Sequence, residues 1–422
     1  MSPNNPNSAT AIDPHSPAGR ALAWPGRPWP RRVAILGSTG TVGLGGLAVV
    51  RQHRDQFEVA ALAAGRRVRE FAAQIEEFRP RTVVVADDRA RSELASLVDL
   101  PPERIAVGEA GLEEIASQPY DVVLQAVAGA AGLPATLGAI AAGNPLALAN
   151  KESMVLAGEL VAARARDTGT PILPVDSEHA GLFQCLAGAA QGAVLAQLTL
   201  TASGGPLRAR ADWQDATPED VLAHPVWKMG ERITVDSALL LNKGFEVIEA
   251  RWLFGVPLSA IDVVVHPQAI VHALLTFVDH STIAQLSVPD MKLPIQLALA
   301  WPARLPAPVP ALDLGRTGRL DFEPLSPGRF PCFDLAREAA RRGGTAPAIL
   351  NAADEIAVGA FLDRRVKLGD VPGLLAGVLD AVPVAPATDL EAIRSADRAA
   401  RDEAEAALAR HAGVRPGARA RA

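Results

Sequence analysis

Short apolar runs alternate with amphipathic stretches over the first 175 residues. The apolar runs predict strands at 32–36, 57–63, 82–85, 105–107, 122–125 and 145–148, and the amphipathic stretches predict helices at 44–52, 68–78, 133–142 and 152–166. Strands that alternate with helices in this way are typical of a parallel sheet covered by helices on both faces. The sequence therefore predicts an α/β fold that begins with a Rossmann-like, doubly wound sheet.

The alternation stops soon after the apolar run 171–175. Strand-like stretches follow at 195–201, 233–237, 263–265 and 282–286, and helical spacing of apolar residues returns at 332–342, 346–362 and 389–409. These patterns predict an α+β domain over 176–302 and a small helical bundle over 332–422. A linker rich in Pro and Leu, 303–331, joins them, and residues 1–31 precede the first domain, 32–175.

Composition excludes two classes of protein. The chain has 422 residues, too many for one ordinary core, and its 49% hydrophobic and 21% charged residues fit a globular protein. A net charge of −6 argues against nucleic-acid binding, which needs an excess of basic residues. The charge-free stretches 122–150 and 180–207 contain mostly Ala and Gly among their apolar residues, so we expect buried segments and no membrane span.

Cysteine use and the N-terminal residues bear on the compartment. Cys185 and Cys332 lie far apart in apolar surroundings, which predicts two buried thiols in a reducing compartment, here the cytoplasm. The first thirty residues are rich in Pro, Ser and Asn and lack the apolar core of a secretory signal. We expect a disordered extension over residues 1–31, with an organellar transit peptide as the alternative.

Glycines follow the first strand at the spacing G-x-x-G-x-x-G, over residues 37–43. Between a strand and a helix, this spacing indicates a turn that lets the backbone approach a dinucleotide pyrophosphate; a turn that only packs helix on strand is the alternative. The second strand ends in Gly65-Arg66-Arg67 instead of an acid. Two guanidinium groups suit a ribose 2′-phosphate and predict NADPH, unless these residues form a solvated basic loop.

Asp176 and Glu178 follow the apolar run 171–175 directly. On an extended strand, residues i and i+2 project to the same side, so the two carboxylates are expected to converge. Converging carboxylates need either a shared proton or a hard divalent cation between them. A solvated acidic turn at the start of a helix is the alternative.

Further polar residues downstream extend this candidate site. Ser203, followed by Gly204 and Gly205, favours an anion-binding nest, and Ser237, Asn242 and Lys243 add donors for a phosphate. Glu246 offers a third acid. Residues 224–230 combine polar and aromatic residues with Pro and Gly, which favours a flexible flap, whereas His266 and His272 are expected in the core.

Eight motifs, taken together and in order, resemble one family, 1-deoxy-D-xylulose 5-phosphate reductoisomerase of the methylerythritol phosphate route to isoprenoids. The motifs occupy 37–43, 149–153, 174–179, 202–206, 224–230, 235–237, 242–244 and 351–356. The resemblance implies a homodimeric enzyme with an NADPH-binding domain at 32–175, a catalytic domain with a flap at 176–302 and a helical domain at 332–422. It also implies conversion of 1-deoxy-D-xylulose 5-phosphate to 2-C-methyl-D-erythritol 4-phosphate.

The resemblance also assigns site residues by position. It implies that Mg²⁺ or Mn²⁺, with Co²⁺ as a further candidate, is held by Asp176, Glu178 and Glu246. It implies that the phosphorylated sugar contacts Lys151, Ser177, Glu178, Ser203, His224, Ser237, Asn242, Lys243 and Glu246. Lys151 and the three acids would serve catalysis. The contacts to NADPH would come from Thr39, Gly40, Thr41, Val42, Gly65, Arg66, Arg67, Asn150, Glu152 and Gly230, and the flap would carry Trp227 and Met229.

Two other readings of the sequence remain open. Another two-domain NADPH oxidoreductase, such as a semialdehyde or sugar dehydrogenase, fits the fold. A semialdehyde dehydrogenase needs a reactive Cys in a polar setting, and Cys185 lies between Gln184 and Leu186. A non-catalytic NADPH-binding regulator is permitted by fold alone, although it has no need for three acids and a phosphate cradle.

Overall fold

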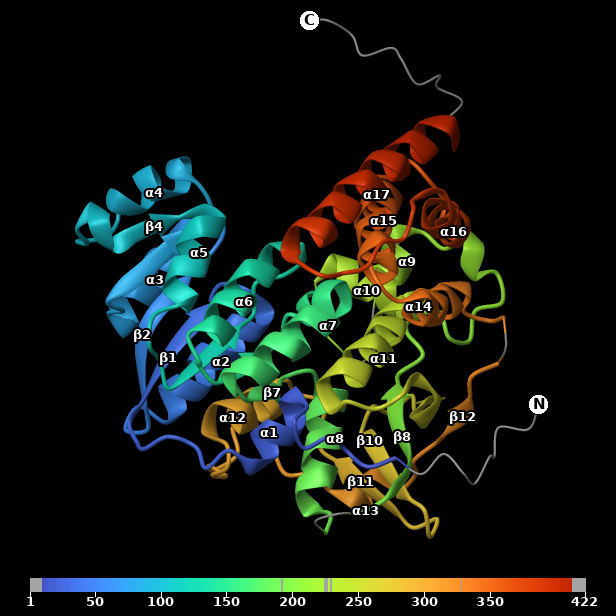
Figure 1. Ribbon diagram of the computed structural model, residues 1–422, viewed down its shortest axis with the longest axis horizontal. Helices are drawn as coiled ribbons and strands as arrows, with labels where there is room; N and C mark the ends of the chain where they lie inside the picture. The colour runs from blue at the N-terminus through green and yellow to red at the C-terminus, as the bar shows by residue number, and fades with distance from the viewer. Residues whose placement is uncertain (1–9, 191–192, 224–226, 228–229, 327, 412–422) are drawn as a thin grey trace, which may run out of the picture.

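A seven-stranded parallel sheet forms the N-terminal part of the computed structural model, which describes residues 10–190, 193–223, 227, 230–326 and 328–411 (Figure 1). The strands lie in the order β4-β3-β2-β1-β5-β6-β7. Their bounds are β1 Arg31–Leu36, β2 Phe57–Ala63, β3 Thr82–Val85, β4 Ile105–Val107, β5 Val122–Gln125, β6 Leu146–Leu148 and β7 Ile172–Pro174. The predicted Rossmann-like class is confirmed.

Helices connect these strands and cover the sheet. They are α2 Thr41–Gln52, α3 Val68–Phe78, α4 Asp88–Ala95, α5 Gly108–Ala116, α6 Leu133–Ala141 and α7 Lys151–Thr168. The strand order reverses between β1 and β5, so the crevice at the carboxyl ends of these two strands is where such a fold binds its ligand. The sequence predicted the strands β1 to β6 and the helices α2, α3, α6 and α7 near their observed positions, but it did not predict α4 and α5.

Strand register brings distant segments to this one edge of the sheet. Leu36 at the end of β1 pairs with Gln125 of β5, Gln125 pairs with Leu148 of β6, and Leu148 pairs with Pro174 of β7. The residues that follow each strand therefore leave the sheet at the same level. These are the glycine turn after β1, the loop after β5, the start of α7 and the Asp176 segment.

A second, five-stranded sheet follows, in the order β11-β10-β8-β9-β12 (Figure 1). Its strands are β8 Leu195–Ala202, β9 Ile261–Val265, β10 Val271–Phe277, β11 Thr282–Leu286 and β12 Glu323–Pro324. Helix α8, Ser177–Gly188, packs against β10 and β11, and α11, Leu241–Phe254, contacts β9. Short α9, Pro218–Leu222, and α10, Glu231–Ala238, precede α11.

Four C-terminal helices pack together as the predicted bundle, at the orange to red end of the chain in Figure 1. They are α14 Pro331–Arg342, α15 Ala346–Leu362, α16 Val371–Ala381 and α17 Leu390–His411. Helix α15 also contacts α7 and α10, so the bundle borders the cleft side of the molecule. Helix α12, Lys292–Ala300, returns to pack on α2 and on β6 and β7. Within the described ranges, we find no helix with the length and apolar content needed to cross a membrane.

Two predicted strand geometries are wrong. Residues 233–237 belong to helix α10, because a five-residue apolar and polar alternation does not distinguish the two periods and Val235 packs into the core from the helix. Asp176 and Glu178 do not lie on a strand: β7 ends at Pro174, Asp176 is the N-cap residue of α8, and Glu178 lies in its first turn. Their convergence therefore has a different cause from the one predicted.

The N-terminal extension is not disordered over the residues that the structure describes. Helix α1, Pro17–Ala23, is capped by Ser16, whose hydroxyl accepts from the Gly19 backbone N–H, and Ala18 and Ala21 are buried. The Trp301 indole donates to the Ala21 carbonyl at 2.8 Å. A single short helix without a charged face gives little sequence signal, and it is tertiary packing that orders it. The predicted linker likewise includes α13, Leu314–Thr317, and β12.

Candidate active site

A cleft of about 400 Å³ opens at the shared edge of the parallel sheet, between α7, α10 and α11. It brings together most of the residues that the sequence singled out. Those that line it are Gly40, Thr41, Val42, Arg67, Asn150, Lys151, Glu152, Asp176, Ser177, Glu178, Ser203, Trp227, Gly230, Ser237, Asn242, Lys243 and Glu246. Segments separated by more than 200 positions, such as those of Gly40 and Glu246, therefore share one cavity.

The glycine turn after β1 has the close backbone approach that a dinucleotide turn requires. Gly37 has a φ of +88°, and a Cβ there would lie 2.4 Å from the Ala126 carbonyl oxygen of the neighbouring loop. Helix α2 begins directly after Gly40, and no side chain caps its first N–H groups. The free N–H groups and the helix dipole favour an anion at this end of the cleft.

Three carboxylates meet in the cleft. One oxygen from each of Asp176, Glu178 and Glu246 lies within 4.8 Å of the others. Asp176 and Glu178 meet because both sit at the start of α8, and Glu246 reaches them from α11. Oxygen donors from three carboxylates are the set that Mg²⁺ and Mn²⁺ prefer, so the residues fit a divalent cation.

Two ammonium groups lie among these acids. Lys151 Nζ lies 2.7 Å from Asp176 Oδ2 and 3.2 Å from Glu246 Oε1, and Lys243 Nζ lies 2.7 Å from Glu178 Oε1 and also donates to Glu246. Asn242 joins the network by donating to Glu246 Oε1 at 2.6 Å and accepting from Lys151 at 2.8 Å. In this state the predicted phosphate ligands Asn242 and Lys243 bind the carboxylates.

The proton affinities of these groups follow from burial and charge. Burial, with the negative charges of Glu246 and Asp176, raises the pKa of Glu178 to about 8. Burial also disfavours a charged Asp176, but Lys151 and His179 outweigh it and hold the pKa of Asp176 well below its usual range. For Lys151, burial is outweighed by Asp176 and Glu246, so its pKa lies above that of a free lysine. A metal cation nearby would act in the opposite direction on Lys151.

A nest of glycines approaches α10 closely at the other end of the cleft. Gly205 has a φ of +70°, and a Cβ there would lie 2.5 Å from the Ser237 carbonyl oxygen. The Gly205 backbone N–H points back to Ser203 Oγ at 3.3 Å. Only glycine allows this approach, which sets Ser203 of the nest beside Ser237 of α10. Both serines line the cleft.

Leu240 makes the turn between α10 and α11. Its φ of 58° is left-handed, an uncommon conformation for a residue with a branched side chain, and Leu240 also lines the cleft. The strained turn places Ser237 at the end of one helix and Asn242, Lys243 and Glu246 at the start of the next. Sequence patterns give no signal for such a turn.

Some predicted residues lie outside the cleft wall. Thr39 is a buried residue of the glycine turn, and neither it nor Gly65 lines the cavity. The Arg66 side chain is 87% exposed, and its Nε lies 3.5 Å from Asp87 Oδ2. His224 and Met229 fall outside the described residues. Arg67 does line the cleft, and it pairs with Glu70 at 3.3 Å.

The two histidines predicted in the core are buried. His266 stacks on Phe322 and its Nδ1 lies 2.7 Å from the Asp321 carbonyl oxygen. His272 lines the cleft from β10, which the sequence did not predict, and its ring centroid lies 6.3 Å from that of Trp227. Burial lowers the pKa of His272 to about 4, so it stays neutral near pH 7.

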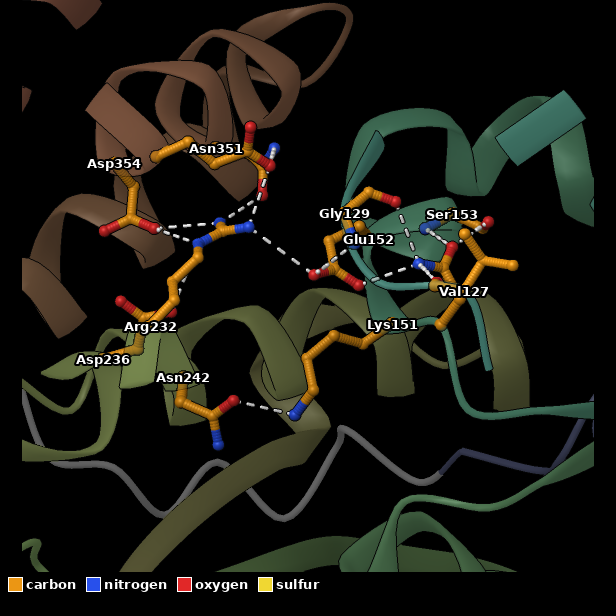
Figure 2. Close-up of polar contacts among 12 residues, drawn as sticks. Val127, Gly129, Lys151, Glu152, Ser153, Arg232, Asp236, Asn242, Asn351 and Asp354 are labelled. Atoms are coloured by element: carbon orange, nitrogen blue, oxygen red, sulfur yellow. Dashed lines mark hydrogen bonds and ion pairs between the residues drawn. The ribbon is translucent and has the colours of Figure 1, made fainter. Parts of the chain in front are cut away.

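A partly buried arginine was missed by the sequence analysis. Arg232, on the first turn of α10, reaches Asp354, Glu355 and Asn351 of α15 and faces Glu152 of α7 (Figure 2). The signal that could have revealed it was the motif at 351–356, whose polar residues had no assigned partner. Arg232 links the C-terminal bundle to the cleft.

Comparisons with known proteins bear on what this cleft does. Family models described as 1-deoxy-D-xylulose 5-phosphate reductoisomerase and its C-terminal domains match residues 33–158, 172–254 and 286–403. A relative of that name from Anaeromyxobacter sp. (strain K) is 51% identical over 89% of this chain and 96% of its own length.

Solved structures agree with the sequence comparison. The Zymomonas mobilis enzyme of the same name, in complex with NADPH, is 38% identical with a TM-score of 0.83, over 90% of this chain and 99% of the other. A reductoisomerase in complex with NADPH, fosmidomycin and magnesium is 39% identical with a TM-score of 0.85, over 91% of this chain and 100% of the other.

Proposed function

The chain belongs to the 1-deoxy-D-xylulose 5-phosphate reductoisomerase family, and from that premise we propose that its cleft binds NADPH, a divalent cation and a phosphorylated sugar together. The reaction is the rearrangement and NADPH-dependent reduction of 1-deoxy-D-xylulose 5-phosphate to 2-C-methyl-D-erythritol 4-phosphate. The convergence of Asp176, Glu178 and Glu246 at the carboxyl edge of a dinucleotide-binding sheet carries the proposal. Fold similarity alone would not supply a cation site.

We propose that different residues of the cleft bind the cation, NADPH and the substrate phosphate. Asp176, Glu178 and Glu246 would hold Mg²⁺, Mn²⁺ or Co²⁺, which when bound supplies Lewis-acid polarisation of the substrate carbonyl. The glycine turn, Asn150 and Glu152 orient NADPH along the sheet edge. The nest at Ser203 and the hydroxyl of Ser237 bind the phosphate far from the reacting carbons, and this binding energy helps to orient them.

We propose that Lys243 exchanges its partners when ligands bind, whereas Lys151 keeps its position. Lys243 contacts Glu178 and Glu246, and Asn242 donates to Glu246. With these two acids holding a cation, Lys243 and Asn242 would be available to bind the substrate phosphate. Lys151 remains between Asp176 and the substrate hydroxyl groups, beside Ser177, and holds a proton there. Trp227 covers the cleft near His272 and helps to exclude water.

A coupled assay tests the proposed function. NADPH oxidation followed at 340 nm, with 1-deoxy-D-xylulose 5-phosphate and Mg²⁺, is expected to proceed in the intact protein and to stop on addition of EDTA. Restored turnover on adding excess Mg²⁺ separates metal loss from denaturation. Turnover that persists in EDTA would contradict a metal-dependent reaction and would favour an ordinary dehydrogenase.

A dehydrogenase with a cysteine nucleophile has little support in the structure. Burial raises the pKa of Cys185 to about 11, and burial together with the charges of Asp354 and Asp236 raises the pKa of Cys332 well above its usual value. Neither thiol lines the cleft. A thiol with a raised pKa is a poor nucleophile at neutral pH.

Cofactor preference depends on the two arginines after β2. Replacing both, Arg66→Ala with Arg67→Ala, is expected to raise the KM for NADPH about tenfold or more, because a 2′-phosphate loses two charge-assisted partners. The KM for NADH, which lacks that phosphate, is expected to stay unchanged. Steady-state kinetics with both cofactors checks this, and an equal effect on NADH would assign the arginines to folding of the loop.

We propose that the protein is a cytoplasmic homodimer. Both cysteines are free and buried, as suits a reducing compartment. Strand β11 lies at the edge of the five-stranded sheet, with residues that are only partly buried, and an edge strand is a natural surface for a second copy.

A further inference from the structure

One guanidinium group ties three helices together behind the cofactor side of the cleft. Arg232 on α10 donates to Glu355 Oε1 at 2.8 Å, to Asn351 Oδ1 at 2.8 Å and to Asp354 Oδ2 at 2.9 and 3.0 Å, all on α15. Its Nη1 also lies 3.6 Å from Glu152 Oε1 at the start of α7. Figure 2 shows Arg232 between α15 on one side and Glu152 on the other.

Glu152, which Arg232 contacts, also forms hydrogen bonds with residues at the edge of the parallel sheet. Its Oε1 accepts from the Gly129 backbone N–H at 3.2 Å, and its Oε2 accepts from Asn150 Nδ2 at 3.0 Å. Asn150 Nδ2 also donates to the carbonyl oxygens of Val127 and Gly129, at 2.8 and 3.0 Å. The loop after β5, which lines the cleft at the topological switch point, is thus held through Asn150 and Glu152.

Arg232 is the shared cationic partner of a cluster of acidic side chains. Four carboxylates face it: Glu152, Asp236, Asp354 and Glu355. Asp236 Oδ1 and Asp354 Oδ1 are buried and have no hydrogen-bond partner among the described residues. Without the guanidinium group, the Glu152 side chain loses its ionic contact with α10 and, among the described residues, is held only by its hydrogen bonds with Gly129 and Asn150.

We propose that Arg232 is a positioning residue for the cofactor: it orients Glu152 and, through Glu152, the Asn150 and Gly129 segment that borders the nicotinamide end of the cleft. The inference rests on the proposed function, because it assumes that NADPH occupies this edge. It also gives a role to the motif at 351–356, whose Asn351, Asp354 and Glu355 form the socket on α15 that fixes the guanidinium. The C-terminal bundle thereby contributes to cofactor binding without touching the cofactor.

Arg401 supplies a matched control. It lies on α17 and binds the same Glu355, with its Nη2 2.5 Å from Oε2, and it also pairs with Asp397 at 2.7 Å. Arg401 therefore shares with Arg232 the charge, the partner and the partly buried setting. It makes no contact with Glu152 or with α10 among the described contacts, so its loss weakens the bundle alone.

Direct titration of the metal-free full chain with NADPH, followed by quenching of tryptophan fluorescence, tests the inference. Arg232→Met is expected to raise the Kd for NADPH about tenfold, as loss of a group that orients a ligand-binding residue does elsewhere, while Arg401→Met leaves it within twofold of the parent. Mn²⁺ affinity is expected to change less than NADPH affinity in Arg232→Met. Arg232→Lys keeps one positive charge among the four acids and is expected to give a Kd for NADPH between those of the parent and Arg232→Met. If Arg232→Met does not fold, the Lys variant takes its place in the test.

A double-mutant cycle distinguishes orientation from general loosening. Glu152→Gln alone is expected to weaken NADPH binding, and adding Arg232→Met to it should weaken binding by less than twofold more, because the two residues act through one contact. Fully additive losses, equal losses in Arg401→Met, or an unchanged Kd in both Arg232 variants would overturn the inference and leave the proposed function intact. A parent chain that does not bind NADPH at all would overturn both.

Discussion

Replacing Glu246 with Gln is expected to lower kcat/KM for 1-deoxy-D-xylulose 5-phosphate by at least about 100-fold, through loss of the cation. Glu246 is 2% exposed and is the acid that both lysines and Asn242 bind. Gln keeps the shape and one acceptor oxygen but removes the negative charge. The Kd for Mn²⁺, measured by titration calorimetry, is expected to rise in parallel, whereas the Kd for NADPH is not.

An exposed acid on a neighbouring helix serves as the control for this variant. Glu159 lies on the solvent side of α7, and Glu159→Gln is expected to retain the activity and Mn²⁺ affinity of the parent. Circular dichroism and thermal unfolding should show that Glu246→Gln is folded, because Asp176 and Glu178 still neutralise the two lysines. A folded variant with parental Mn²⁺ affinity would remove Glu246 from the cation site.

The sequence predicted the parallel sheet well because its strands are short, mostly apolar segments that are buried between two layers of helices. Strands β2 and β5 are apolar except for Glu58 and Gln125, and turns rich in Gly, Asn or Pro separate such strands from the helices. The glycine turn, the start of α7 and the Asp176 segment all follow such strands directly. Parallel register then places them at one edge, so that their meeting in the cleft follows from the sheet alone.

Features that depend on contacts between distant segments could not be predicted from local sequence patterns. Helix α10 was predicted as a strand because its β-branched residues favour extended structure locally, and packing against α11 and α15 overrides that preference. Arg232 carries no signal of its own, since its partners are more than 100 residues away on α15. Helix α1 is ordered by burial of two alanines, which are too small to create an apolar pattern.

Asp176 and Glu178 show how a correct site can follow from a wrong local geometry. The i and i+2 argument for a strand does not apply, because the N-cap and the first turn of α8 bring the two carboxylates together instead. The alternative of an acidic turn at a helix start is right about the location. It is wrong about solvation, because Glu246 and two lysines enclose the acids.

Replacing Lys151 with Met is expected to lower kcat by about 100-fold or more, the usual effect of removing a group that holds or moves a proton at the reacting atoms. Lys151 Nζ lies 2.7 Å from Asp176, and its removal takes positive charge away from the acids. Mn²⁺ affinity is therefore expected to be unchanged or higher, the opposite of Glu246→Gln, and the Kd for NADPH should stay near that of the parent. Lys367, an exposed lysine paired with Asp215, gives the control Lys367→Met, which should be fully active. Stopped-flow kinetics measures the expected fall in kcat, and a Mn²⁺ titration measures the expected unchanged or higher metal affinity. Full activity in Lys151→Met would exclude the ammonium group from the chemistry.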